Sequence, residues 1–301
     1  MAQIRTSKLI WMDGKFVKWK NAKIHIVTHA LHYGSSVFEG VHSYKTDEGT
    51  AIFRLNEHID RLFLSANALS MKIAFTKNQL KSAIKNLLRI NRLSDAYIRP
   101  LAYYGYGNIG VFPKDIQTNI TIITVPWGNY YSKDLRIMTS RFARHSEKSI
   151  VFGAKIGGNY ANSIMAMHDA RKKWYDEALM LDHEGFVSEG PAENIFMVKG
   201  NALLTPSSKS ALHGITRSSI MQIAHDLKIK TYEKKITLEE LKNSDEIFFC
   251  GTATEIAPII SVDDKKIGNG RIGNVTSLLR DKFYEIVRGK DKKYKKWLTY
   301  V

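Results

Sequence analysis

The chain has 301 residues, of which 44% are hydrophobic and 25% are charged. This composition excludes the disordered, collagen-like and disulfide-scaffold classes and is typical of a globular protein of about two domains. No apolar run reaches the roughly 20 residues that a membrane-spanning helix needs. The single cysteine, Cys250, excludes an intrachain disulfide and an all-cysteine zinc site. We therefore predict a cytoplasmic protein with no membrane partner.

The charge balance is unusual, because 45 Lys and Arg residues stand against 29 Asp and Glu residues, a formal net charge of +16. Such an excess is typical of a nucleic-acid-binding protein or of a protein with an anionic substrate or cofactor. The basic residues are spread along the chain, and it contains neither zinc-finger spacing nor an aromatic RNA-binding signature. We predict no nucleic-acid partner. The densest basic run, 290–296, is typical of a solvated tail.

In the first part of the chain, turn signals and apolar periodicity predict the elements. The dipeptide Asp13-Gly14 predicts a hairpin between 9–12 and 16–17. Asn56 and Thr76 are predicted to cap two helices with apolar residues at helical spacing. Further strands are predicted at 37–44, 50–55, 96–104 and 119–125.

The second part continues with strands, hairpins and helices in irregular alternation. Predicted in chain order are strand 135–139, helix 159–174, hairpins turning at 183–185 and 200–201, helix 215–228, strands 231–232 and 246–250, and helix 275–287. This pattern predicts two α+β domains rather than a doubly wound parallel sheet. We place a small N-terminal domain at 1–127, an interdomain connection at 128–134 and a large C-terminal domain at 135–301.

Two familiar site patterns do not hold. The matches to G-x-G-x-x-G at 105–110 and 268–273 lack the strand, turn, helix and second strand that a dinucleotide site requires. The histidines His25, His29 and His32 have no carboxylate at metal-ligand spacing, so we predict no metal.

Lys155 is the most informative single residue, because Gly, Ala, Ile and Gly flank it. An ammonium group in such surroundings loses hydration, which favours the neutral amine, a nucleophile that forms a Schiff base with a carbonyl. The flanking glycines let the backbone approach a flat ligand closely. Taken alone, the segment is better explained as an ordinary loop lysine.

Three further segments complement a reactive lysine. Glu189 precedes Gly-Pro in a turn, where a fixed carboxylate can pair with a protonated ring nitrogen. The segments 212–217 and 250–255 offer backbone N–H groups to an anion, at a helix start and after a strand. Taken alone, each has an ordinary structural explanation: Glu189 as an acid in a turn, 212–217 as the start of a helix, and 250–255 as the end of a strand. Together with Lys155 they are what pyridoxal 5′-phosphate requires.

With these motifs in order, the chain resembles the branched-chain amino-acid aminotransferases of the fold-type IV pyridoxal-phosphate enzymes, from residue 10 to about 283. The resemblance implies a two-domain α+β fold with the cofactor at the domain interface. The segments that carry it are 32–40 (HYGSSVFEG), 57–62 (EHIDRL), 97–100 (YIRP), 126–128 (PWG), 154–160 (AKIGGNY), 188–190 (SEG), 214–217 (GITR) and 251–253 (GTA).

The resemblance also implies a role for each matching residue. Lys155 would be the catalytic residue, holding the cofactor and moving the proton. Glu189 would pair with the ring nitrogen, Tyr160 would bond the ring hydroxyl, and Leu212 would pack on the ring. The phosphate would be held by Arg61, Ile215, Thr216 and Thr252. The substrate would be bound by Tyr33, Phe38, Tyr97, Arg99, Ile109, Val111, Tyr130, Thr252 and Ala253, with Arg99 and Tyr97 taking the second carboxylate of glutamate.

The implied reaction is transamination between branched-chain L-amino acids (Leu, Ile, Val) and 2-oxoglutarate, giving branched-chain 2-oxo acids and L-glutamate. The implied assembly is a homodimer or homohexamer. D-amino-acid aminotransferase and aminodeoxychorismate lyase share the fold and stay open as alternatives. The segments 32–40 and 97–100 favour the branched-chain class.

Overall fold

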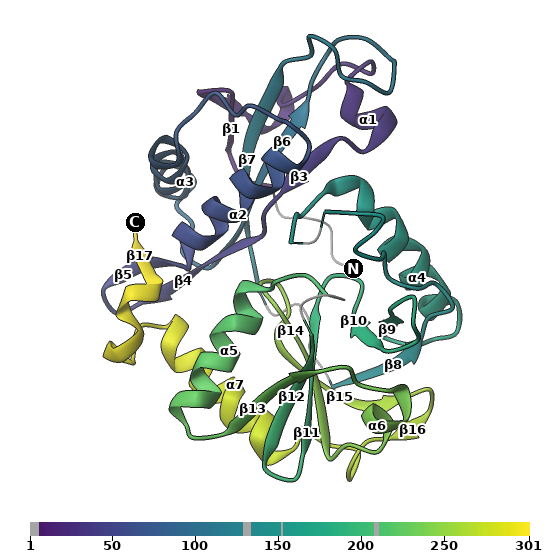
Figure 1. Ribbon diagram of the computed structural model, residues 1–301. Helices are drawn as coiled ribbons and strands as arrows, with labels where there is room; N and C mark the ends of the chain where they lie inside the picture. Colours follow the sequence, from purple (N-terminus) through teal and green to yellow (C-terminus); the bar gives the residue numbers. More distant parts are fainter. Residues whose placement is uncertain (1–5, 129–133, 152, 208–210) are drawn as a thin grey trace. The chain divides into compact units, whose positions relative to one another are not determined.

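The computed structural model describes residues 6–128, 134–151, 153–207 and 211–301. The chain divides into two compact units (Figure 1). The first comprises Met1–Gly128, Ala154–Gly158 and Glu285–Val301, and the second comprises Asn129–Gly153 and Asn159–Tyr284. The predicted connection 128–134 lies mostly outside the described residues.

The first unit is built on an antiparallel sheet. Its strands lie in the order β17-β5-β4-β6-β7-β1-β2, with β3 also paired to β6. The predicted hairpin at Asp13-Gly14 is confirmed, because β1 pairs with β2. The strand predicted at 37–44 is instead two strands, interrupted at Glu39 and Gly40. The strands are β1 (Leu9–Met12), β2 (Lys15–Lys18), β3 (Ser36–Phe38), β4 (Val41–Thr46), β5 (Gly49–Phe53), β6 (Ala96–Tyr104), β7 (Thr118–Pro126) and β17 (Leu298–Tyr300).

The helices of this unit are α1 (His29–Tyr33), α2 (Leu55–Ala68) and α3 (Lys77–Asn91), with short 3₁₀ turns at Trp19–Asn21 and Lys292–Trp297. Thr76 caps α3 as predicted, in a capping box with Gln79. The prediction that Asn56 caps α2 is wrong, because the N-cap is Arg54 in a left-handed conformation. Strand β5 ends at Phe53, and the Arg54 amide donates to the Trp297 carbonyl, so the chain turns two residues earlier.

The segment Ala154–Gly158 belongs to the first unit because it is hydrogen-bonded to the chain around β3. The Phe38 amide donates to the Lys155 carbonyl at 3.2 Å, and the Gly158 amide donates to the Gly34 carbonyl at 3.0 Å. Gly34 has a φ of +62°, and a Cβ there would lie 2.6 Å from the Gly158 Cα. Gly34 is therefore required where these backbones meet, and a Cβ on Gly158 would lie only 3.2 Å from the Gly34 carbonyl oxygen.

The lysine-rich run near the C-terminal end is not a solvated tail. Its 3₁₀ turn buries Tyr294 and Trp297 between exposed lysines, and β17 then pairs with β5. Trp297 packs against Phe53, and the Arg54 guanidinium lies 4.9 Å from its ring centroid. The large domain predicted at 135–301 thus differs from the observed second unit, because these contacts hold 285–301 in the first.

The second unit contains a mixed sheet in the order β10-β9-β8-β15-β14-β11-β12-β13, with β16 paired to β15. The pairs β8–β9, β8–β15 and β12–β13 are parallel, and the others are antiparallel. The strands are β8 (Leu135–Thr139), β9 (Glu177–Leu181), β10 (Val187–Glu189), β11 (Asn194–Lys199), β12 (Ala202–Pro206), β13 (Lys230–Lys234), β14 (Glu246–Gly251), β15 (Glu255–Val262) and β16 (Lys265–Lys266).

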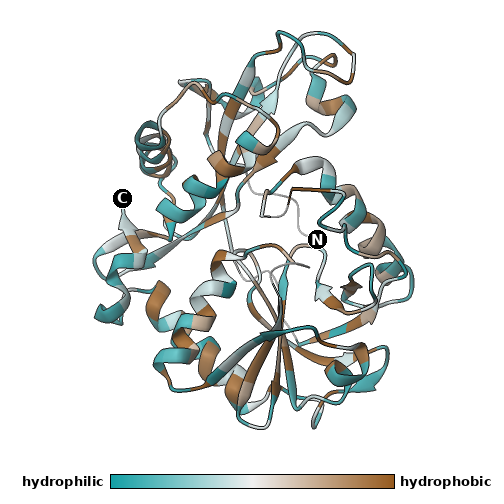
Figure 2. Ribbon diagram, in the orientation of Figure 1, coloured by the Kyte–Doolittle hydropathy of each residue, from teal (hydrophilic) through white to brown (hydrophobic). Residues whose placement is uncertain are grey.

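The helices of this unit are α4 (Tyr160–Lys172), preceded by a 3₁₀ turn at Gly157–Asn159, α5 (Ile215–Asp226), α6 (Leu238–Lys242) and α7 (Asn274–Val287), whose last residues belong to the first unit. Hairpins, parallel pairs and helices alternate irregularly, so the predicted α+β class is confirmed. The hydrophobic residues lie largely on the strands and on one side of the helices (Figure 2). Among the described residues, no helix has the length and apolarity needed to span a membrane.

We predict that Trp297→Ala destabilises the protein, because it empties a buried aromatic site between Phe53 and Tyr294. The expected loss is about 3 kcal/mol, measured as a lower urea midpoint. Lys296→Ala, an exposed neighbour, is the control and should change stability by less than about 0.5 kcal/mol. Equal midpoints for the two variants would contradict the structural role of this segment.

Candidate active site

Lys155 is held in the first unit by its own backbone. Its amide donates to the Ser65 Oγ at 2.8 Å, and its carbonyl accepts the Phe38 amide. The side chain is half-buried, and Nζ lies 4.9 Å from the centroid of the Phe38 ring. The segment is therefore fixed by β3 and α2, while the amine lies on an aromatic surface.

Arg99 and Tyr97 lie beside the same ring. The Arg99 guanidinium carbon lies 4.5 Å from the Phe38 centroid, and Nη2 donates to the Tyr97 hydroxyl at 2.7 Å. Within the described part of the chain, the buried Arg99 Nε has no hydrogen-bond partner. A Cβ on Gly40 would collide with the Tyr97 hydroxyl, so Gly40 is required for this placement. The structure thus brings four of the predicted site residues together.

Arg61 is tied to a buried carboxylate. Its Nε and Nη2 donate to the two Glu39 oxygens at 2.6 and 2.9 Å, and His58 Nδ1 donates to Glu39 Oε2 at 2.7 Å. Burial alone would raise the pKa of Glu39, but the Arg61 and His58 charges and hydrogen bonds lower it to about 2. Burial also lowers the pKa of His58, against the charge of Glu39, which raises it. The orientation of Arg61 is therefore set by Glu39.

Tyr33, Ile109 and Val111 form a separate cluster. The Tyr33 hydroxyl donates to the Ile109 carbonyl, and His29 Nε2 donates to the next carbonyl, Gly110, at 2.9 Å. Ser35 Oγ lies 2.7 Å from His29 Nδ1 and completes the arrangement. Ile109 and Val111 are exposed, with 64% and 77% of their surface accessible. Tyr130, predicted to share their role, lies outside the described residues.

The histidines singled out in the sequence serve hydrogen bonds. His25 Nδ1 accepts the Val27 amide, and His32 Nε2 donates to the Ile26 carbonyl. Across the described ranges, no group of three or more His, Cys, Asp or Glu residues is arranged to hold a metal ion.

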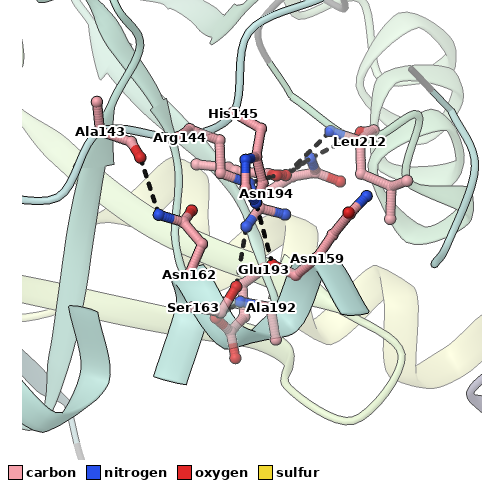
Figure 3. Close-up of polar contacts among 11 residues, drawn as sticks. Ala143, Arg144, His145, Asn159, Asn162, Ser163, Ala192, Glu193, Asn194 and Leu212 are labelled. Carbon is pink, nitrogen blue, oxygen red and sulfur yellow. Dashed lines mark hydrogen bonds and ion pairs between the residues drawn. The ribbon is translucent and has the colours of Figure 1, made fainter. Parts of the chain in front are cut away.

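Glu189 is the centre of the second unit's polar network, and its partners Arg144, Asn194 and Leu212 are labelled in Figure 3. Arg144 Nε donates to Oε1 at 2.7 Å, while the Leu212 amide and Asn194 Nδ2 donate to Oε2 at 3.0 and 3.2 Å. Asn194 also donates to the Leu212 carbonyl, and Arg144 Nη1 donates to Ser163 Oγ. Both Glu189 and Arg144 are largely buried. Glu189 is therefore a fixed carboxylate with an arginine counter-ion.

Helix α5 begins directly after the Glu189 network. Gly214 is its N-cap and has no side chain to bond the N–H groups of Ile215 and Thr216. A Cβ on Gly214 would collide with Asn194 Oδ1, so a capping side chain cannot replace this glycine. Such a helix start combines open N–H groups with the positive end of the helix dipole. It is suited to an anion, as the sequence predicted.

Thr252 and Ala253 lie in the tight turn between β14 and β15, closed by the pairing of Gly251 with Glu255. Glu193 contacts this turn, because its Oε1 accepts the Thr254 hydroxyl at 3.2 Å. Tyr160, predicted to bond the ring hydroxyl, is the first residue of α4 and is half-buried.

Several residues of this arrangement had no predicted role. Glu39 and His58 lie inside motifs quoted from the sequence, and Asn194 lies four residues after the 188–190 segment, but only the structure shows what they bond. Arg144 lies outside every motif and is 45 residues from its partner Glu189. No pattern in neighbouring residues predicts an ion pair between residues that far apart in the sequence. The only available signal was chemical: a buried acid needs a cation or a proton.

Comparison with known proteins agrees with this geometry. The family model for amino-transferase class IV matches residues 36–262. The chain is 42% identical over 298 residues to the branched-chain-amino-acid aminotransferase of Pseudomonas aeruginosa, covering 97% of each chain. It is 39% identical over 299 residues to the enzyme of that name from Escherichia coli, again covering 97% of each.

A solved structure is similarly close. The crystal structure of the T.th. branched-chain amino acid aminotransferase, complexed with N-(5′-phosphopyridoxyl)-L-glutamate, has a TM-score of 0.95 and 41% identity. The similarity covers 99% of each chain. The present chain belongs to the class IV aminotransferase family.

We predict that Glu39→Gln destabilises the protein by about 3 kcal/mol at pH 7, because it removes the charge that neutralises Arg61. The pKa of Glu39 lies below its ordinary value of 4.5, so its stabilising contribution is complete above pH 4.5 and is lost as the pH falls towards 2. The variant should lack this acid-dependent loss. Urea unfolding at pH 7, 5 and 3 measures both effects.

Glu48→Gln is the control for this prediction, because Glu48 forms an exposed ion pair with Lys295. Such pairs contribute about 0–1 kcal/mol. If Glu39→Gln were no more destabilising than Glu48→Gln, the buried Glu39–Arg61 pair would not contribute the stability assigned to it.

Proposed function

We propose that this chain is a branched-chain-amino-acid aminotransferase. It transfers the amino group of L-leucine, L-isoleucine or L-valine to 2-oxoglutarate, giving branched-chain 2-oxo acids and L-glutamate. The observation that carries the proposal is the near-complete coverage of the chain by relatives of that name. The site residues described above fit the same chemistry.

The cofactor is pyridoxal 5′-phosphate, which supplies an electron sink for the substrate α-carbon. Lys155 holds it covalently and moves the proton. Glu189 accepts the ring N–H: a carboxylate oxygen has two acceptor positions, and Oε1 accepts Arg144 Nε at one of them. Arg144 supplies the opposite charge that keeps this buried carboxylate an acceptor. Leu212, fixed to Glu189 through its amide, packs on the ring, and Tyr160 bonds the ring hydroxyl.

The phosphate group is bound by Arg61, Ile215, Thr216 and Thr252. The start of α5 supports this assignment, since Gly214 leaves the first-turn N–H groups of Ile215 and Thr216 uncapped by a side chain. Arg61 adds a guanidinium whose direction is set by Glu39.

The substrate side has to accept both an aliphatic chain and a second carboxylate. Arg99 is suited to the carboxylate of glutamate, because its buried Nε has no partner within the described residues and Nη2 is oriented by Tyr97. Phe38 offers an apolar surface beside it. Tyr33, Ile109, Val111 and Tyr130 are proposed to bind the aliphatic chain because the family resemblance implies it. The first three lie in the separate cluster described above, and Tyr130 lies outside the described residues. Thr252 and Ala253 bind the α-carboxylate through their backbone amides.

The predicted homodimer or homohexamer and the cytoplasmic location stay predictions. D-amino-acid aminotransferase and aminodeoxychorismate lyase remain the alternative activities of this fold. The segments 32–40 and 97–100 favour the branched-chain class, because they contribute Phe38, Tyr97 and Arg99 to one cluster.

We predict that the purified protein shows visible absorption that L-leucine removes and 2-oxoglutarate restores. The Lys155→Ala variant, purified in the same way, should lose transamination, because the amine that holds the cofactor is absent. Lys148→Ala, a nearby loop lysine, is the control and should retain activity. A response to D-alanine but not to L-leucine would shift the activity to the D-amino-acid class, and substantial turnover by Lys155→Ala would refute the role of Lys155.

We predict that Arg99→Ala lowers kcat/KM for L-glutamate at least tenfold more than for L-leucine, which corresponds to about 1.4 kcal/mol. The reason is that only glutamate carries a second carboxylate to pair with the guanidinium. Steady-state kinetics with both amino acids measure the ratio. Equal losses for the two substrates would instead assign Arg99 to the structure of the Phe38 cluster.

A further inference from the structure

Glu193 links the two turns that hold proposed cofactor residues of the second unit. Its carbonyl accepts the Gly190 amide at 2.8 Å, and its Oε2 accepts the Ala192 amide at 3.0 Å, in the turn that follows Glu189. Its Oε1 accepts the Thr254 hydroxyl at 3.2 Å, in the turn that contains Thr252. One side chain, only 4% exposed, therefore connects both turns.

The surroundings of this carboxyl group are acidic. Glu177 on β9 is 1% exposed and Glu189 on β10 is 4% exposed, and the charges of both act on Glu193. Cys250 on β14 also faces Glu193, and Arg217 on α5 faces Cys250. Arg217 forms its own ion pair with Glu233 at 3.0 Å.

The hydrogen-bond donors to Glu193 are a backbone amide and a hydroxyl, neither of which carries a charge. Burial, followed by the charges of Glu177 and Glu189, raises the pKa of Glu193 to about 8. A pKa raised in this direction favours the protonated, uncharged carboxyl group at neutral pH. It differs from Glu39 and Glu189, which meet arginine guanidinium groups.

We propose that Glu193, in its uncharged form, is a positioning residue for the Thr252–Thr254 turn and sets the upper pH limit at which this turn binds an anion. An ionised Glu193 would bring a negative charge into hydrogen-bond contact with the turn that has to bind a phosphate or a carboxylate. In low-dielectric surroundings, the repulsion between Glu193 and the bound anion is only weakly screened. The inference rests on the proposed function, because Thr252 and Ala253 contact anions only in that assignment.

The test compares the full chain with Glu193→Gln, which has the shape of the protonated acid but cannot ionise. The dissociation constant for pyridoxal phosphate is measured from pH 6 to pH 9.5 by absorption or tryptophan fluorescence. Above pH 8, the ratio of the wild-type constant to that of Glu193→Gln should rise by up to about tenfold per pH unit. A ratio that stays constant across this range overturns the inference.

Thr254→Val is the matched variant for the positioning role. It keeps the shape of the side chain and removes the hydroxyl that Glu193 accepts. We expect weaker binding at every pH. The pH dependence should persist but move to higher pH, because Glu193 still titrates and the lost Thr254 hydrogen bond had lowered its pKa. Unchanged binding by Thr254→Val would refute the link between Glu193 and the turn.

Urea unfolding provides a readout that needs no cofactor. A carboxyl group with a raised pKa holds its proton in the folded state after the unfolded chain has lost it, so wild-type stability falls between pH 4.5 and 8. Glu193→Gln should therefore gain stability relative to wild type over this range and keep a constant advantage above pH 8. A pH-independent difference overturns the uncharged state.

The outcomes also separate this inference from the proposed function. If no variant binds pyridoxal phosphate at any pH, the proposed function fails, together with the anion-binding role of Glu193. If the cofactor binds but the ratio of constants is independent of pH, the proposed function stands and the inference alone fails.

Discussion

Carboxyl groups buried from water have to meet a cation or keep a proton, and this requirement organises both units of the protein. Glu39 meets Arg61 and His58, and Glu189 meets Arg144. Glu193 has only uncharged donors and keeps its proton. Each arrangement lies next to residues assigned to cofactor or substrate, so the groups that hold the fold also orient the proposed site.

The three carboxyl groups differ in what they do for that site. Glu39 pairs its charge with Arg61 and so orients the guanidinium that is proposed to bind the phosphate group. Glu189 shares Arg144, Asn194 and the Leu212 amide, an arrangement that leaves acceptor capacity for a ring N–H. Glu193, in its uncharged form, holds the Thr252–Thr254 turn through the Thr254 hydroxyl. The net charge of +16 is thus less informative than the local pairing, because the site depends on which acids are neutralised.

Local signals predicted elements well where the deciding contacts were local. Thr76 and Gln79 form a capping box within one turn of helix, and the Asp13-Gly14 hairpin closes on its own neighbours. Predictions failed where distant chain decides the outcome. The start of α2 moved from Asn56 to Arg54 because the Trp297 carbonyl accepts the Arg54 amide, and the basic C-terminal run became ordered structure because β17 pairs with β5.

The sequence by itself determined the α+β class, most strand and helix positions and the motifs around Lys155, Glu189, Gly214 and Thr252, because turn chemistry, apolar periodicity and motif order are written in neighbouring residues. Only the tertiary structure decided that Arg144 pairs with Glu189, that 154–158 and 285–301 join the first unit, and that Glu193 bridges two turns. Those outcomes depend on burial and on donors that are dozens of residues away. Neither the charge of a buried acid nor the identity of its partner can be determined until the chain has folded around it.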